Sequence, residues 1–319
     1  MPDTYTFTVF TPTYNRAATL PRVYESLTKQ TYRNFEWLIV DDGSTDHTRE
    51  LVNLWISQDA FPIRYVYQDH GHKKAAFNRA VRLTRGELFL TLDSDDECIP
   101  VALERFWWHW NNIPSSTRGQ YSAVTALWVY PDGTVVGTKF PTSGYLDSDS
   151  IEVSRRWKVK GDKWGFQRLD VLRECAFHEN LEGNVPEGVV WTQIAEKYKT
   201  RYINEELGIC HQENHSGAEG RLTRKRNPIL DAEGLSVWTE SVFQRQWRYF
   251  RDDPRYFVHT AINFIRFHLH IRRLSLSHMA RLPGWWLLFA MMPAGCLAHW
   301  MDRWRHRSPS TRSAAESIG

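Results

Sequence analysis

The chain has 319 residues, with 40 Lys and Arg against 37 Asp and Glu, so its formal net charge is only +3. This length accommodates one large domain with an appendage, and the small charge gives no reason to expect a nucleic-acid partner. Cys98, Cys175, Cys210 and Cys296 lie far apart in the sequence, without the spacing of a metal or redox motif. They favour reduced thiols in a reducing compartment.

The first predicted strand covers residues 5–10, where apolar and polar residues alternate, and a polar loop with the sequence Thr-Pro-Thr-Tyr-Asn-Arg follows at 11–16. A helix is predicted over residues 17–30. Amides and side chains of a loop in this position could hold a base and a ribose.

A second strand is predicted over residues 35–40, followed by the loop Asp-Asp-Gly-Ser-Thr-Asp at 41–46. Ser44 or Thr45 is suited to cap the helix that runs towards Ile56. A carboxylate in this loop could accept the imide N–H of a pyrimidine. For Asp41 the alternative stays open that it only stabilises the turn, because Asp before Gly and Ser is common in turns.

A third strand, residues 63–67, a helix, and a fourth strand, residues 87–92, complete a βαβαβαβ order that ends in Asp-Ser-Asp-Asp at 93–96. Ligands of open α/β sheets bind outside the carboxyl ends of the strands, so three polar loops should face one crevice. Carboxylates there could hold Mg²⁺ or Mn²⁺ together with a diphosphate. Lys73 and Lys74 open the third helix, where a solvated basic face is the favoured interpretation.

Three motifs, Thr-Pro-Thr-Tyr-Asn-Arg, Val-Asp-Asp-Gly-Ser-Thr-Asp and Leu-Asp-Ser-Asp-Asp, in this order and at these spacings, resemble those of inverting family 2 glycosyltransferases. The resemblance covers residues 5–215 and implies a GT-A (Rossmann-like) α/β fold that binds a nucleotide-diphospho-sugar. It implies that Asp95 ligates the metal directly. It assigns the following residues to donor binding: Thr11, Pro12, Tyr14, Arg16, Asp41, Asp42, Asp93 and Ser94.

The acceptor half is predicted to begin after residue 99, with a β-hairpin turning at Pro131-Asp132-Gly133. Residues 159–165 form a loop whose Gly161 could let the backbone approach the donor sugar, as in the glycine loop of these enzymes. Asp162 could bind sugar hydroxyls. A plain turn remains the competing account of both residues.

Pro186 and Glu187 open a predicted helix, and an acid in this position is stabilised by the helix dipole. The resemblance implies instead that Glu187 is the general base that deprotonates the acceptor hydroxyl. The usual Glu-Asp pair is replaced here by Glu187 and Gly188, so a single carboxylate is available, with Glu182 as a reserve candidate.

His211 begins the sequence His-Gln-Glu-Asn-His-Ser, whose His-x-x-Asn-x-Ser spacing resembles a late motif of this fold. By that resemblance His211 could contribute to the metal or diphosphate site. A structural role is the alternative, since imidazole is a poor ligand of Mg²⁺ although Mn²⁺ accepts it better.

The C-terminal part alternates apolar, aromatic and basic residues, and an uncharged run at 283–301 contains Pro293 and Gly295, with Trp near both ends. The run is marginal for a spanning helix, so an interfacial or re-entrant membrane anchor is expected. A hairpin packed on the catalytic domain is the alternative. We therefore predict a catalytic domain at 1–225, with halves at 1–99 and 100–225, a helical region at 226–307 and a disordered tail at 308–319.

The predicted function is transfer of one sugar from a nucleotide-sugar donor, UDP-linked by default, to a saccharide or lipid-linked acceptor in surface-polysaccharide assembly, assisted by Mn²⁺ or Mg²⁺. The N-terminus lacks a signal-peptide pattern, which predicts a cytoplasmic location at the inner-membrane surface. Transfer to polyprenyl phosphate and a non-catalytic nucleotide-sugar-binding scaffold are the alternatives. Residues 244–249 approach the Gln-x-x-Arg-Trp signature of processive synthases with Trp and Arg in the wrong order, so we expect no polymerisation.

Overall fold

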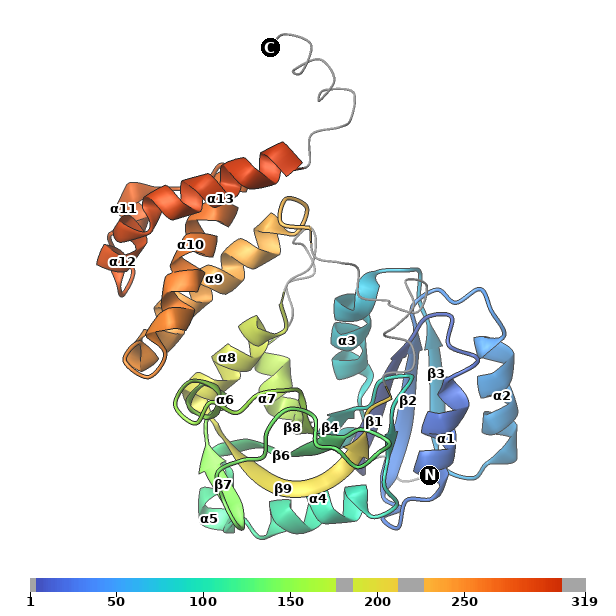
Figure 1. Cartoon of the computed structure of the whole chain (residues 1–319). Helices are drawn as coiled ribbons and strands as arrows, with labels where there is room; N and C mark the ends of the chain where they lie inside the picture. The colour runs from blue at the N-terminus through green and yellow to red at the C-terminus, as the bar shows by residue number, and fades with distance from the viewer. Residues whose placement is uncertain (1–3, 176–185, 212–226, 306–319) are drawn as a thin grey trace. The chain divides into compact units, whose positions relative to one another are not determined.

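The computed structural model describes residues 4–175, 186–211 and 227–305. The chain divides into two compact units (Figure 1). The sheet unit comprises residues 1–179 and 193–222, and the helical unit comprises residues 180–192 and 223–319. The segment that carries Glu187 therefore groups with the C-terminal helices.

The sheet unit is built on one mixed sheet, whose strand order among the described residues is β3-β2-β1-β4-β8-β6-β9-β5, with β7 paired to β9. Strands β3, β2, β1 and β4 are parallel, so the predicted βαβαβαβ order is confirmed. β8 pairs antiparallel to both β4 and β6. The strands are β1 Tyr5–Thr13, β2 Phe35–Asp41, β3 Ile63–Tyr67, β4 Gly86–Thr91, β5 Glu97–Cys98, β6 Tyr121–Val129, β7 Tyr145–Ser148, β8 Lys163–Arg168 and β9 Lys199–Ile209.

Helices connect these strands and cover the sheet (Figure 1). Helix α3 contacts β1, β2 and α7, whereas α4 contacts β6 and β9. In the sheet unit the helices are α1 Leu20–Thr28, α2 Thr48–Gln58, α3 His72–Leu83, α4 Ala102–Asn111, α5 Ser115–Arg118, α6 Ser150–Arg155 and α7 Leu169–Glu174; α8, Gly188–Lys197, begins in the helical unit and ends in the sheet unit.

Alternate residues of β1 pack on opposite faces of the sheet, as the two-residue period of a strand requires. Phe7 and Val9 join a core cluster with Val23 of α1. Phe10 packs instead against Phe77 of α3, with ring centroids 6.0 Å apart. Both faces are apolar, because helices cover both.

Two local predictions need correction. Helix α2 begins at Thr48, and neither Ser44 nor Thr45 caps it. The N-cap is His47, whose side chain makes no capping hydrogen bond, while the carboxylate of Asp46 accepts from the backbone N–H of Thr48 at 3.1 Å. The turn at residues 131–133 forms, but only the isolated bridge from Val129 to Val135 follows it, without a second strand.

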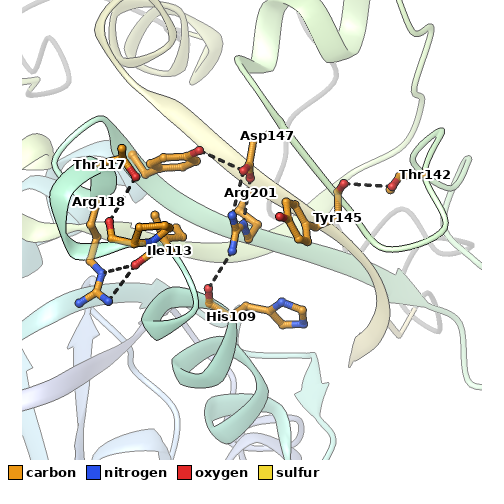
Figure 2. Close-up of polar contacts among 10 residues, drawn as sticks. His109, Ile113, Thr117, Arg118, Thr142, Tyr145, Asp147 and Arg201 are labelled. Carbon is orange, nitrogen blue, oxygen red and sulfur yellow. Dashed lines mark hydrogen bonds and ion pairs between the residues drawn. The ribbon is translucent and has the colours of Figure 1, made fainter.

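An ion pair is built into the acceptor half of the sheet unit (Figure 2). The guanidinium of Arg201 donates to both carboxylate oxygens of Asp147, at 2.9 and 2.8 Å, and lies over the ring of Tyr145. Tyr121 donates its hydroxyl to the same carboxylate at 3.0 Å. Only 4% of the Arg201 side chain is exposed, so this pair fixes β7 on β9 from inside the fold.

The helical unit packs around aromatic residues of α9 and α10, among them Phe243, Phe257 and Phe264. These two helices contact each other, and α10 also contacts α13. The helices are α9 Ala232–Gln246, the short 3-10 helix η1 Trp247–Tyr249, α10 Pro254–His270, α11 Leu276–Met279, α12 Trp285–Ala290 and α13 Met292–Arg305.

The apolar run at 283–301 is divided between α12 and α13. Helix α13 packs on α10 through Gly295, where an added Cβ would lie 2.5 Å from Ile265, and through buried Asp302. Asp302 accepts from Arg266 at 2.6 and 2.5 Å and pairs with His270 at 2.8 Å. In the described part of the chain, no helix has both the length and the apolarity needed to cross a bilayer.

Candidate donor and acceptor site

The loops after β1 and β2 are joined by Asn15. This residue has a φ of 52°, a left-handed conformation that Asn tolerates better than most residues. Its side-chain oxygen accepts from the backbone N–H of Thr45 at 2.8 Å, and its own backbone N–H donates to the Ser44 hydroxyl at 2.8 Å. Asn15 thus sets the relative position of two loops predicted to bind the donor.

Both carboxylates that follow β2 are buried and engaged within the protein. Asp41 accepts from the backbone N–H of Ser44 at 2.8 Å and from the hydroxyl of Tyr65. Asp42 accepts from the Gln68 side chain at 2.7 Å and from the Gly71 backbone at 2.9 Å. They stabilise the turn after β2 and the loop after β3, which is the alternative account that the sequence left open for Asp41.

The remaining residues predicted after β1 lie in different environments. The Thr11 hydroxyl is buried and is used within the fold, since it donates to the Leu92 carbonyl at 2.8 Å and accepts from Trp37 at 2.9 Å. Pro12 lies beside Val40 of β2. The ring of Tyr14 is partly exposed and lies 4.7 Å from the ring of His70, between centroids.

The acidic loop at 93–96 is tied to helix α1 and the residues before it through its backbone. The Ser94 carbonyl accepts from the Thr19 hydroxyl at 2.9 Å, and the Asp95 carbonyl accepts from Arg22 at 2.8 Å. These contacts leave the side chain of Asp95 for other partners, and an Arg16 nitrogen lies 3.9 Å from its carboxylate. The loop after β4 therefore meets the loop after β1, as the parallel order predicts.

Cations accompany the carboxylates of this loop. Asp93 is 43% exposed and pairs with Lys73 at 3.1 Å, so Lys73 does more than cover a solvated helix face. Asp93 and Asp95 provide the oxygen ligands that Mg²⁺ and Mn²⁺ prefer, and such ions take one or two protein carboxylates with phosphate and water completing the shell. No group of three or more His, Cys, Asp or Glu side chains converges as a metal site within the described residues.

Asp96 and His211 contact each other at the buried side of the acidic loop at 93–96. Burial raises the pKa of Asp96 to about 7, and the neighbouring Asp93 and Asp95 add to the rise. The Asp96 carboxylate accepts from the His211 backbone at 3.0 Å. The His211 ring meets Glu97 through Nε2 at 2.8 Å, while its buried Nδ1 has no hydrogen-bond partner among residues 4–175, 186–211 and 227–305. That unpaired nitrogen is compatible with the predicted ligand role.

The glycine loop has a structural explanation. Gly161 has a φ of +78°, and an added Cβ would lie 2.7 Å from the Cα of Gly137, so two glycines allow these backbones to touch. Asp162 is exposed. Burial is the main cause that raises the pKa of the Cys210 thiol to about 12, and the negative charges of Asp96, Asp95 and Asp162 add to the rise. Asp162 therefore lies within electrostatic range of the acidic loop.

Glu187 is exposed and directly precedes α8, and its carbonyl accepts from the Val190 backbone at 3.0 Å. Its neighbour Gly188 packs on α9, where an added Cβ would lie 2.7 Å from the indole of Trp238. The Thr192 hydroxyl accepts from Gln246 at 3.2 Å. Contact with Trp238 leaves no room for a side chain at position 188. The reserve base Glu182 lies outside the described residues.

Sequence reasoning missed three residues that shape these loops. Asn15, between Tyr14 and Arg16, signals the left-handed turn through its residue type. Tyr65 carried no signal, because its bond to Asp41 depends on the register between β2 and β3. The contact of Trp238 with residue 188 carried no local signal, because the two residues are far apart in the sequence.

Comparison with known proteins identifies the family. Residues 8–154 match the family described as Glycosyl transferase family 2. An uncharacterized glycosyltransferase of Escherichia coli, YibD, is 30% identical over 243 residues, which are 72% of this chain and 68% of the relative. A Campylobacter jejuni GalNAc(5)-diNAcBac-PP-undecaprenol beta-1,3-glucosyltransferase is 26% identical over 63% of each chain.

The fold agrees with that family. Staphylococcus aureus TarS 1-349 in complex with UDP-GlcNAc has a TM-score of 0.64 at 15% identity, covering 94% of this chain and 93% of that one. Several other curated glycosyltransferases match the chain over only 21% to 35% of their own length. The chain belongs to glycosyl transferase family 2, a family of inverting hexosyltransferases with the GT-A fold.

Proposed function

We propose that the protein transfers a single sugar from a nucleotide-diphospho-sugar to a hydroxyl of a saccharide or lipid-linked acceptor, with inversion at the anomeric carbon. The observation that carries this proposal is the acidic loop at 93–96, held by α1 at the carboxyl end of a parallel strand. The Campylobacter relative is named for a diphospho-undecaprenol-linked acceptor, and TarS was crystallised with UDP-GlcNAc. The TarS complex supports a UDP-sugar donor, and the name of the Campylobacter relative supports a lipid-linked saccharide acceptor.

The donor residues divide into two groups. The first group stabilises the loops at the strand ends through hydrogen bonds within the protein; it consists of Asp41, Asp42, Thr11 and the backbone of Ser94. The nucleotide would bind to the surface formed by these loops, and Pro12 would be part of that surface. The side chains of Tyr14, Arg16 and the exposed Asp162 would contact the nucleotide or the sugar. Asp93 would stay near the diphosphate, with Lys73 balancing its charge.

Asp95 would hold a Mn²⁺ or Mg²⁺ ion, with His211 as a second ligand through its unpaired nitrogen. The ion would neutralise the departing diphosphate. Glu187 would accept the proton of the acceptor hydroxyl as the new C1–O bond forms and the bond from C1 to the diphosphate oxygen breaks. This chemistry needs no covalent intermediate, and Glu187 is exposed directly before α8.

A panel of nucleotide sugars, assayed for binding and slow donor hydrolysis with Mn²⁺, Mg²⁺ or EDTA, tests the proposal. Metal-dependent turnover of one donor is expected, with loss of metal-dependent donor binding in Asp95→Ala. Glu174→Ala, on the exposed surface of the same unit, is the matched control and should bind normally. Equal donor turnover in EDTA and in Asp95→Ala would refute the metal role, whereas binding without any turnover would favour the scaffold alternative.

We also propose that α12 and α13 rest on an anionic membrane surface at the cytoplasmic face. Residues 297, 300, 301 and 304 of α13 lie at helical spacing on one exposed stripe, opposite the face that packs through Gly295 and Asp302. Interfacial helices combine Trp and Leu with nearby Arg. The exposed apolar residues are Trp285, Trp286, Phe289, Leu297, Trp300, Met301 and Trp304, with Arg281, Arg303 and Arg305 beside them in the sequence.

Sedimentation of the full chain with vesicles tests this surface. Vesicles containing anionic lipid should retain the protein, and Trp300→Ser with Trp304→Ser should weaken retention about tenfold or more. Trp157→Ser removes an exposed Trp from the sheet unit and should leave retention unchanged. Equal retention of the double variant would refute the proposed surface.

A further inference from the structure

The helical unit contains a cavity of about 420 Å³ between α9 and α10. This volume lies within the usual range for small-ligand sites. The cavity lining comes mainly from both helices and includes three aromatic rings, a side-chain amide, an imidazole and a guanidinium. They are Trp238, Tyr256, Phe267, Asn263, His259 and Arg266.

The cavity combines aromatic surface with polar groups, of which the Arg266 guanidinium is neutralised by Asp302. The apolar C–H faces of a sugar ring pack against aromatic side chains, and its hydroxyls bond to amide and imidazole groups. Asn263 lies between the other polar groups, since its amide nitrogen is 3.1 Å from His259 Nδ1 and its oxygen accepts from Arg266 at 3.3 Å. The polar groups therefore form one connected edge of the cavity.

The charge of the cavity argues against an anionic ligand. The Arg266 guanidinium donates two hydrogen bonds to Asp302, at 2.6 and 2.5 Å, and only 5% of the Asp302 side chain is exposed. Arg266 is thus already paired with a carboxylate, which leaves little positive field for a phosphate. A neutral sugar suits this site better than a nucleotide or a sugar phosphate.

Trp238 connects the cavity to the candidate base. The same indole that lines the cavity is the surface against which Gly188 packs, with 2.7 Å between an added Cβ and the ring. Gly188 directly follows Glu187, and the next turn of α8 is joined to α9 by the bond from Gln246 to Thr192. A ligand against Trp238 would therefore lie beside the segment that carries Glu187.

We infer that this cavity binds a neutral pyranose ring of the acceptor, with Trp238 as both its wall and the positioning residue for Glu187. The inference rests on the proposed function, because it assigns an acceptor to the Glu187 side of that reaction. It gives the C-terminal helices a role in acceptor recognition in addition to the proposed membrane contact.

Ligand-observed saturation-transfer NMR on the full chain tests the cavity directly. The probes are the methyl glycosides of glucose, galactose, mannose and N-acetylglucosamine, with glucose 6-phosphate as the charged comparison. At least one neutral glycoside should bind, and Asn263→Ala should weaken its binding about tenfold, the scale of one lost hydrogen bond. Gln244→Ala removes an exposed amide from α9 outside the cavity and should leave binding unchanged.

Trp238→Phe keeps an aromatic ring, so the fold should survive while the contact with Gly188 changes. We expect acceptor KM and kcat of the transfer reaction to worsen together, with unchanged metal-dependent binding of the donor. Absence of glycoside binding, equal binding by Asn263→Ala, or stronger binding of glucose 6-phosphate would overturn the inference. If donor hydrolysis persists in those cases, the proposed function stands, whereas loss of donor turnover in the unchanged protein would remove both.

Discussion

The loops after β2 and β4 are both rich in Asp, yet they use their carboxylates differently. Asp41 and Asp42 are almost completely buried and accept hydrogen bonds from the protein. Asp93 and Asp95 keep 43% and 22% of their side chains exposed, and their nearest partners are the cations Lys73 and Arg16. Of two acidic loops at the same edge of the sheet, one therefore uses its carboxylates to stabilise the fold, whereas the other keeps them accessible to a ligand.

Glu187 should behave as a carboxylate available for chemistry. Glu187→Gln should lower transfer by about 100-fold or more, the scale expected for loss of a general base, while donor binding and the melting temperature stay unchanged. Steady-state transfer and a donor titration measure the two effects. Full activity of the variant would place the base elsewhere.

Asp147 should behave as a carboxylate that holds the fold. Asp147→Ala leaves the guanidinium of Arg201 buried without its partner (Figure 2), and removing one member of a buried ion pair costs about 3 kcal/mol of unfolding free energy. Glu174→Ala breaks an exposed pair with Lys197 and should cost less than about 1 kcal/mol. Denaturant unfolding compares them, and equal costs would contradict the distinction.

Glu205 offers a smaller effect that depends on pH. Burial alone would raise its pKa, but hydrogen bonds from Arg105 and His109 outweigh burial and hold the pKa at about 2. A carboxylate with a lowered pKa stabilises the fold above its unfolded pKa and loses that contribution as pH falls towards 2. The melting temperature of the unchanged protein should exceed that of Glu205→Gln at pH 6, with the difference shrinking below pH 4.5. A constant difference would exclude this linkage.

The first half of the fold could be predicted because local patterns determine it. Four strands of the parallel part were predicted from alternating or continuous apolar residues, and polar loops at their carboxyl ends placed the candidate donor residues together. Residue types at strand ends carry this information within a short stretch of sequence, so no knowledge of distant contacts was needed.

The helical contribution could not be predicted in the same way. Contact between Gly188 and Trp238 joins residues 50 positions apart. Pro293 and Gly295 marked the apolar run at 283–301 as interrupted, but they did not show how α12 and α13 pack. Gly161 is similar, because its need for glycine arises from the backbone of Gly137. Such requirements come from tertiary packing, which local periodicity does not record.

The environments of the four cysteines make the protein suitable for site-selective labelling without further mutation. Cys98 and Cys175 are buried, and burial raises the pKa values of the Cys98 and Cys210 thiols to about 12, which suppresses the reactive thiolate at neutral pH. Cys296, on α13, is exposed. A maleimide dye should therefore attach at Cys296 and report directly on the surroundings of that helix.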